Sequence, residues 1–238
     1  MKRALRQQLE SWQLCGVNEI FVKRKLPHQA VPIKQSFATK QDWLSYNQIA
    51  YKDCQKCPLW KGRVKFVYGE GDADATVMVI GEGPGEQENI QGRPFVGPAG
   101  QLLDKMLQAI MIEREDAYIA NVVKCRPPNN RNPEQSERCT CLPYLKEQIE
   151  IIQPKIFLLM GLVAAHTLLE TSLPMHTLRE SVHTLYDRPA FVTYHPSSLL
   201  RNPNNKRPTW EDLQKFQIVY DEIRSKTKGK SNAAPITI

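Results

Sequence analysis

The 238-residue chain has no apolar run long enough to cross a bilayer. Its basic N-terminus, MKRALRQQLESWQLCG, lacks the uninterrupted apolar segment of a secretory signal and carries Glu10. These two absences argue against an integral membrane protein and against a secreted one. We therefore expect a cytoplasmic protein with no membrane partner. In that reducing compartment, paired cysteines are more often metal ligands or redox groups than disulfides.

The glycine-rich loop GEGPG, at residues 81–85, lacks the third glycine of a dinucleotide-binding fingerprint, because Glu86 occupies that position. Glu82 and Glu88 would also repel a pyrophosphate. A glycine-rich loop that carries carboxylates suits a neutral or cation-like reacting centre better. The plainer alternative is a tight turn whose acidic side chains face water.

The composition is that of a folded protein, with 41% apolar residues in a chain long enough for one sizeable domain. Its 32 basic and 25 acidic residues give a net charge of +7. A basic surface favours polyanions such as nucleic acid. The excess is spread along the chain, however, and by itself indicates no particular partner.

Alternating strands and helices predict an α/β fold. Compact apolar runs predict strands at residues 76–81, 117–123, 155–161 and 190–194. Apolar residues at helical spacing predict helices at residues 99–112, 134–152, 163–170 and 208–223. This alternation indicates a parallel sheet covered by helices on both faces.

Three loops, at residues 82–98, 124–133 and 195–207, leave the carboxyl ends of predicted strands. Ligands of parallel sheets bind at that edge, so we expect one site built from all three loops.

The domain organisation is predicted as an N-terminal extension (1–40), one α/β domain (41–225) and a mobile polar tail (226–238). Charge clusters and prolines interrupt the extension, where only residues 5–14 have the pattern of an amphipathic helix.

The cysteines are arranged as two separated pairs. The full set is Cys15, Cys54, Cys57, Cys125, Cys139 and Cys141. Cys54 and Cys57 form a CxxC motif, and Cys125 with Cys141 would complete a four-thiolate site for zinc or an iron–sulfur cluster. Zinc ribbons usually have two tight knuckles, so the wide second spacing favours the cluster. Spacing alone does not show whether Cys139 or Cys141 is the fourth ligand. The alternative to a metal site is that these cysteines are small buried apolar residues.

The segment YHPSSLLR, residues 194–201, begins where a predicted strand ends. His195 before Pro196 would be held rigidly there, and histidine is a natural donor to a developing anion near neutral pH. A structural, hydrogen-bonded histidine is equally compatible with the pattern. The segment ends in an apolar tip with a cation, formed by Leu199, Leu200 and Arg201. Such a tip suits a wedge pushed into a base stack beside a phosphate. Ordinary loop packing is the alternative.

Together these motifs resemble the family 4, iron–sulfur uracil-DNA glycosylases of the uracil-DNA glycosylase superfamily. The matching stretches are CQKCPL (54–59), GEGPGEQEN (81–89), GRPFVGPAGQLLDKML (92–107), NVVKCRPPNNRNP (121–133), CLPYL (141–145) and YHPSSLLR (194–201). The resemblance spans about residues 50–223. It implies a three-layer αβα sandwich with a central, mainly parallel four-stranded sheet.

The resemblance also implies a structural [4Fe–4S] cluster, held by Cys54, Cys57, Cys125 and Cys141. It favours Cys141 over Cys139 because the family's fourth ligand precedes a proline–aromatic–leucine run like residues 143–145.

The activity implied by the resemblance is monofunctional hydrolysis of the N-glycosidic bond of deoxyuridine in single- or double-stranded DNA. The target base must be flipped out of a duplex before it can react. By resemblance, Phe95 stacks on the uracil and Asn121 reads its polar edge, whereas cytosine presents the opposite pattern. His195 would stabilise negative charge on the departing base, and Glu82 and Glu88 would line the pocket.

On the DNA side, the resemblance implies that Leu199 fills the gap left by the flipped base and that basic residues such as Arg201 contact phosphates. We expect the protein to act as a monomer.

Two departures from related branches limit the implied mechanism. The best-known branch has a water-positioning aspartate where this chain has Gly83, in the substrate-binding loop. Water activation then falls to Glu82, to Glu88 or to no strong base, and Glu82 is our prediction. A branch that binds uracil-DNA covalently uses a histidine after the second strand, and residues 125–133 contain none.

Two other interpretations remain open at the level of sequence. One is a non-catalytic iron–sulfur protein that binds damaged or uracil-containing DNA. The other is a zinc-stabilised α/β domain without an assigned role. Intact Phe95, Asn121 and His195 favour the enzyme.

Overall fold

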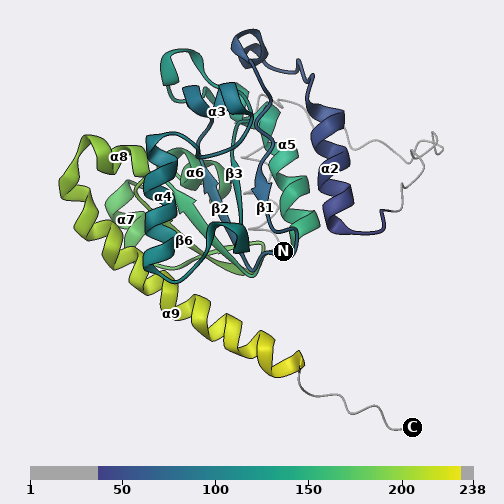
Figure 1. Ribbon diagram of the computed structural model, residues 1–238. Coiled ribbons are helices and arrows are strands. Elements are labelled where there is room, and N and C mark those ends of the chain that lie inside the picture. Colours follow the sequence, from purple (N-terminus) through teal and green to yellow (C-terminus); the bar gives the residue numbers. More distant parts are fainter. Residues whose placement is uncertain (1–36, 232–238) are drawn as a thin grey trace, which may run out of the picture.

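Four short runs of apolar residues form the middle of a sheet in the computed structural model, which describes residues 37–231 (Figure 1). These parallel strands are β2 (Val77–Gly81), β3 (Ala117–Asn121), β4 (Ile156–Met160) and β6 (Arg188–Thr193). Every residue of β2, β3 and β4 is buried. Continuous burial is typical of parallel strands covered on both faces. The predicted parallel core is thus confirmed.

The prediction of four strands is wrong, because the sheet has six, in the order β1-β3-β2-β4-β6-β5. The additional strands are β1 (Glu70–Gly71) and β5 (His183–Leu185), which pair antiparallel with β3 and β6 at the two edges. Strands of two and three residues are too short to show an alternating pattern, so the sequence gives no strand signal for them.

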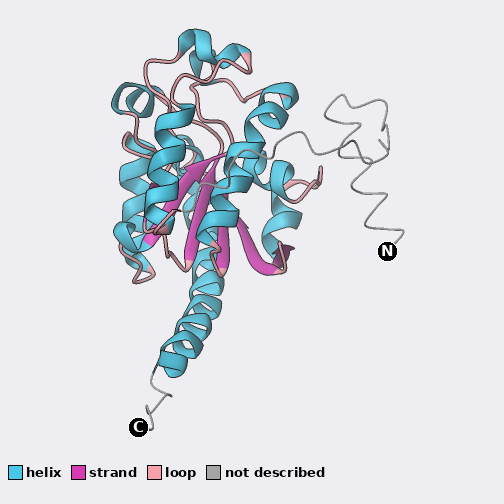
Figure 2. Ribbon diagram, turned by 90° about the vertical axis from the view of Figure 1, so that its right-hand side faces the viewer, coloured by secondary structure: helices cyan, strands magenta, loops and turns pink. Residues whose placement is uncertain are grey.

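Helices cover both faces of the sheet, which confirms the three layers (Figures 1 and 2). Met78 and Ile80 of β2 face one layer, and Val77 and Val79 face the other. The first layer contains α2 (Lys40–Tyr51), α5 (Gln135–Ile152), α6 (Leu162–Leu168) and α7 (Met175–Glu180). The second contains α4 (Pro98–Ala109), α8 (Pro196–Arg201) and α9 (Lys206–Ser231).

Short elements at the connections were not predicted. They are α3 (Glu86–Gln91), α7, α8 and the 3-10 turns η1 (Pro58–Gly62), η2 (Arg114–Asp116), η3 (Pro128–Asn130) and η4 (Pro203–Asn205). Helix α2 was also missed, although Thr39 and Asp42 form a capping box at its start.

The domain boundaries stay predictions. The predicted helix at residues 5–14 lies outside the described residues. Helix α9 continues to Ser231, past the predicted start of the tail at residue 226. Within residues 37–231, no helix is both long enough and apolar enough to cross a membrane.

Candidate active site

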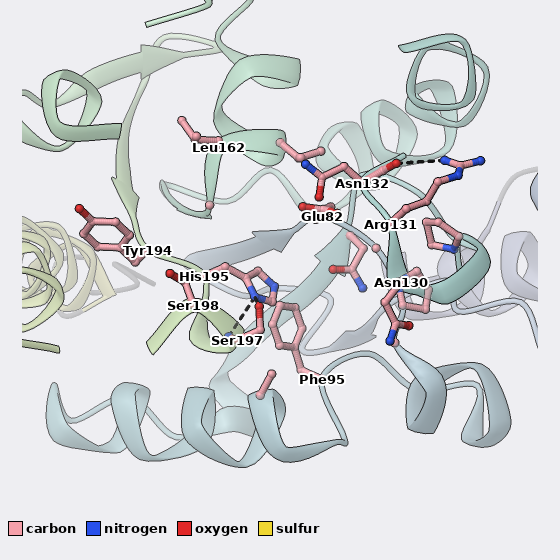
Figure 3. Close-up of a pocket in the computed structure, with 18 of the residues that line it drawn as sticks. Glu82, Phe95, Asn130, Arg131, Asn132, Leu162, Tyr194, His195, Ser197 and Ser198 are labelled. Carbon is pink, nitrogen blue, oxygen red and sulfur yellow. Dashed lines mark hydrogen bonds between the residues drawn. The ribbon is translucent and has the colours of Figure 1, made fainter. Parts of the chain in front are cut away.

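A cavity of about 480 Å³ opens at the carboxyl edge of the parallel strands (Figure 3). Loops after β2, β3 and β6 contribute to its wall, as the sequence predicted. Seven of the predicted site residues line it: Glu82, Gly83, Glu88, Phe95, Asn121, His195 and Arg201. The structure therefore brings together side chains that are more than a hundred residues apart in the chain.

The floor of the cavity depends on a glycine at the end of β2. Gly81 pairs with Asn121 in the β2–β3 register. A Cβ atom at Gly81 would lie 2.5 Å from both Asn121 Oδ1 and Phe95 Cζ. Any larger residue would push the amide and the ring apart, so Gly81 permits their close approach.

The Asn121 side chain is buried but incompletely paired. The residue is 2% exposed and lines the cavity. Its Oδ1 atom has no hydrogen-bond partner among residues 37–231. A buried acceptor without a partner is costly. Asn121 is thus suited to receive a donor from a ligand.

The Phe95 ring lies over the imidazole of His195, with 5.4 Å between ring centroids and 29° between planes (Figure 3). Its backbone has a φ of +52°, in the left-handed region that side chains rarely adopt. Gly100 of α4 makes room for this conformation, because a Cβ there would come within 1.9 Å of the Phe95 carbonyl oxygen.

Glu88 holds two loops together. Its carboxylate accepts hydrogen bonds from the backbone N–H groups of Gly85 at 3.1 Å, Val96 at 2.9 Å and Gly97 at 2.9 Å. Both oxygens are therefore engaged. Glu88 lines the pocket as predicted, but it is bound to the backbone and poorly placed to activate water.

Glu82 has a different environment. No residue of the described range donates a hydrogen bond to its carboxylate. Burial raises its pKa from 4.5 to about 7, although the positive charges of Arg138 and Arg201 oppose the shift. Glu82 can therefore exchange a proton near neutral pH.

Gly83 follows Glu82 and has no room for a side chain. A Cβ atom at this position would lie 2.7 Å from Cγ2 of Val123. An aspartate here would require Val123 to move, so packing accounts for the glycine.

His195 is the N-cap residue of α8. Its Nδ1 accepts a hydrogen bond from the backbone N–H of Ser197 at 3.2 Å, and the Ser197 hydroxyl lies 2.9 Å from the same nitrogen. Burial, together with the charge of Arg201, lowers the pKa of His195 to about 4. The imidazole is therefore neutral at pH 7 and carries its proton on Nε2.

Leu199, the predicted wedge, does not reach the surface in the structure. Leu199 is 3% exposed and packs in the core cluster that includes α4 and α9. The next residue, Leu200, is 50% exposed. Because six-residue α8 turns successive side chains by about 100°, only one of these leucines faces the core. Sequence pattern gave no way to tell which.

Three of the four predicted cysteine ligands have perturbed pKa values, and the causes include neighbouring thiols. Burial raises the pKa of Cys141 to about 12, and it also raises the pKa values of Cys57 and Cys125. Neighbouring thiols contribute to each of these shifts. A metal that binds such thiols deprotonates them outright, so this set of four thiols is compatible with a metal site.

Hydrogen-bond donors point at three of these sulfurs. Arg63 Nη1 lies 3.6 Å from Cys125 Sγ, the Tyr144 hydroxyl lies 3.0 Å from Cys54 Sγ, and the backbone N–H of Lys124 lies 3.3 Å from Cys141 Sγ. Such donors are typical of iron–sulfur centres, whose properties they adjust.

Within residues 37–231, no three ligand side chains converge on one metal ion. A single tetrahedral zinc needs each sulfur at about 2.3 Å. An iron–sulfur cluster separates its cysteines further, because each binds a different iron. Four thiolates are a donor set that both kinds of centre accept.

The family model of the uracil DNA glycosylase superfamily matches residues 68–214. The chain belongs to this superfamily. It is 44% identical to the type-4 uracil-DNA glycosylase of Saccharolobus solfataricus over 178 residues, which are 70% of this chain and 81% of that protein. It is 41% identical to the type-4 uracil-DNA glycosylase of Thermotoga maritima over 181 residues, which are 74% of this chain and 94% of that protein. A type-5 enzyme of Pyrobaculum aerophilum is 34% identical over 163 residues. The chain therefore falls in the type-4 branch.

The sequence analysis did not identify the buried residues that hold the Asn121 backbone in place. Lys124 is fully buried, and its Nζ donates to the backbone oxygen of Asn121 at 3.0 Å and to Oε1 of Gln148 at 2.6 Å. In a basic loop a lysine gives no signal that it is buried. Gln148, on a helix of mixed polarity, gives none either.

Proposed function

We propose that the protein is a monofunctional uracil-DNA glycosylase that hydrolyses the N-glycosidic bond of deoxyuridine in DNA. The products are free uracil and an abasic site, the first step of base excision repair. The observation that carries this proposal is the buried, partnerless Oδ1 of Asn121 beside the Phe95 ring. The type-4 relatives named above support it.

Base recognition follows from the chemistry of the Asn121 amide. Uracil offers a donor at N3–H and an acceptor at O4, which match the amide oxygen and nitrogen. Cytosine presents a lone pair at N3, which would face the buried oxygen and leave it unpaired. A buried mismatch of this kind costs far more than the net value of one hydrogen bond. The Phe95 ring would stack on the face of the base.

His195 would stabilise the departing base. Cleavage leaves negative charge on the uracil ring, and the neutral imidazole can donate its Nε2 proton as a hydrogen bond to that charge. Because Ser197 fixes the tautomer, the donor is ready before the reaction begins. A neutral donor also keeps a fixed positive charge away from the cation-like sugar.

Glu82 would position the attacking water and accept its proton. Glycoside hydrolysis passes through an oxocarbenium-like state, so a weak nucleophile suffices and a carboxylate nearby stabilises the sugar. Glu82 fits this role because no backbone group within residues 37–231 donates to its carboxylate, whereas three backbone N–H groups donate to Glu88.

DNA contact would involve the exposed end of α8. We assign the apolar wedge to Leu200 in place of Leu199, since a wedge must reach the base stack. Arg201 lines the cavity, and it would contact a phosphate next to the flipped nucleotide. The wedge would matter in duplex DNA and less in single strands.

A [4Fe–4S] cluster on Cys54, Cys57, Cys125 and Cys141 completes the proposal. The mutual effects of the thiols on their pKa values and the donors aimed at them support this ligand set. Hydrolysis requires no electron transfer, so the cluster would supply rigidity to the polypeptide.

A single-turnover assay tests the function. The substrate is a labelled duplex with one U·G pair, and a T·G duplex serves as the control. Alkali-labile cleavage at uracil alone is expected. Tight binding without cleavage would contradict catalysis and favour the DNA-binding alternative. Gel filtration with and without DNA tests the further proposal that the protein is a monomer.

A further inference from the structure

We propose that Arg114 is a positioning residue that holds the Phe95 ring in place for stacking on the base. This inference rests on the proposed function, because it concerns how the uracil pocket is built. Arg114 lies in η2, outside every motif that the sequence analysis identified.

Phe95 needs an external restraint. Its φ of +52° is unfavourable for a residue with a side chain. Without restraint the loop can relax toward ordinary backbone angles, and this would swing the ring away from the cavity. The ring position is therefore set by what binds the backbone around residue 95.

Arg114 binds that backbone directly. Its Nη1 donates to the carbonyl oxygen of Phe95 at 3.1 Å, and its Nη2 donates to the carbonyl oxygen of Pro94 at 2.7 Å. Two bonds from one planar guanidinium fix the orientation of two successive peptide groups, which one flexible ammonium group could not do.

Two carboxylates hold the Arg114 guanidinium in turn. Glu70 of β1 lies 2.8 Å from Nη2, and Asp104 of α4 lies 2.6 Å from Nη1. The Arg114 side chain is 17% exposed. Because its charge is matched and its donors are used, Arg114 is not available to contact a DNA phosphate. The short edge strand β1 thus contributes to the site indirectly, because its Glu70 binds the guanidinium that holds the Phe95 backbone.

Arg93 provides a matched control. It also pairs with Glu70, at 2.7 Å, but its side chain is 61% exposed. Its hydrogen bonds go to Glu70, and it donates to neither of the two loop carbonyls. Replacing Arg93 removes a comparable salt bridge and leaves the Phe95 backbone bonded.

The experiment compares R114Q, R114K and R93Q with the wild type, in single-turnover excision from U·G duplexes and in inhibition by free uracil. R114Q should lower the single-turnover rate constant by about tenfold to a hundredfold, as expected for a displaced reactive geometry. It should weaken uracil inhibition by a similar factor. R93Q should stay within about twofold of the wild type.

A double-mutant cycle separates positioning from general destabilisation. If Arg114 acts through Phe95, R114Q should have an effect of about twofold or less in an F95L background. R114K keeps the charge next to Glu70 and Asp104, so it serves for the same cycle if R114Q is poorly folded.

Equal rates for R114Q and R93Q, or an undiminished effect of the Arg114 change in the F95L background, would overturn this inference alone. A wild type that leaves uracil in place would overturn the proposed function and the inference together.

Discussion

Replacing Glu82 by glutamine should abolish a pH dependence that the wild-type enzyme shows. Burial raises the pKa of Glu82 to about 7. If its carboxylate accepts the proton of the attacking water, the single-turnover rate should rise with pH and level off above about pH 8. One unit below the pKa, about one tenth of the molecules are ionised, so the rate there should be about tenfold lower.

His195 does not contribute to this rise. Its pKa of about 4 leaves the imidazole neutral across the whole range of the assay. Among the described residues that line the pocket, Glu82 is therefore the group whose pKa lies near 7. In the E82Q variant the profile should be flat and should lie below the wild-type plateau.

The same shift predicts an effect on stability. The pKa of Glu82 is higher in the folded chain, about 7, than its ordinary value of 4.5. Between these values the folded state binds more protons, so stability decreases as pH rises from about 4.5 to 7. The difference corresponds to at most about 3 kcal/mol, and partial solvent access reduces it. E82Q should therefore be more stable than the wild type at pH 8, and not at pH 4.

The assay needs the rates and urea midpoints of wild type and E82Q at several pH values. The control is E86Q, since Glu86 is exposed and only pairs with Arg126 at 3.5 Å. E86Q should reproduce the wild-type profile. The role of Glu82 would be refuted if the pH–rate profile of E82Q still had its midpoint near pH 7. A wild-type rate in E82Q at pH 8 would refute it as well.

Three further predictions concern other parts of the site. Asn121→Ala and His195→Ala should each slow excision by about a hundredfold through loss of preorganised hydrogen bonds, and near-normal rates would remove the assigned role. Leu200→Ala should slow excision from duplex DNA more than from single strands. Leu199→Ala should instead lower the melting temperature, by creating a cavity of the kind that costs about 2–5 kcal/mol; the reverse pattern would restore Leu199 as the wedge. Cys141→Ser should give protein with less iron and less brown absorption, and an unchanged spectrum would exclude Cys141 as a ligand.

The sequence was sufficient for the central part of the fold. Strands β2, β3, β4 and β6 are nearly all apolar, and their alternation with long helices allows few topologies. The two edge strands could not be predicted, because β1 has two residues and β5 three. Their pairing depends on the neighbouring strand rather than on their own residue pattern.

For the site, motifs indicated which residues gather but not how each is used. Glu82 and Glu88 lie in one glycine-rich loop, and the sequence alone does not distinguish their roles. Three backbone N–H groups occupy Glu88, while burial leaves Glu82 able to titrate. The same limit applies to Leu199 and Leu200, since the orientation of a single-turn helix comes from packing against α4.

Hydrolysis transfers no electrons, so the proposed cluster would have a mechanical role. Five residues, 121–125, carry the proposed base-reading amide at one end and a proposed cluster ligand at the other. Between them, Lys124 bonds the Asn121 carbonyl oxygen through Nζ and the Cys141 sulfur through its backbone N–H. A cluster that joins Cys125 to Cys141 would connect the segment after β3 to α5, next to the two hydrogen bonds of Lys124. A misplacement of 1 Å can cost about a hundredfold in rate, so fixing Asn121 in this way is reason enough for the cluster.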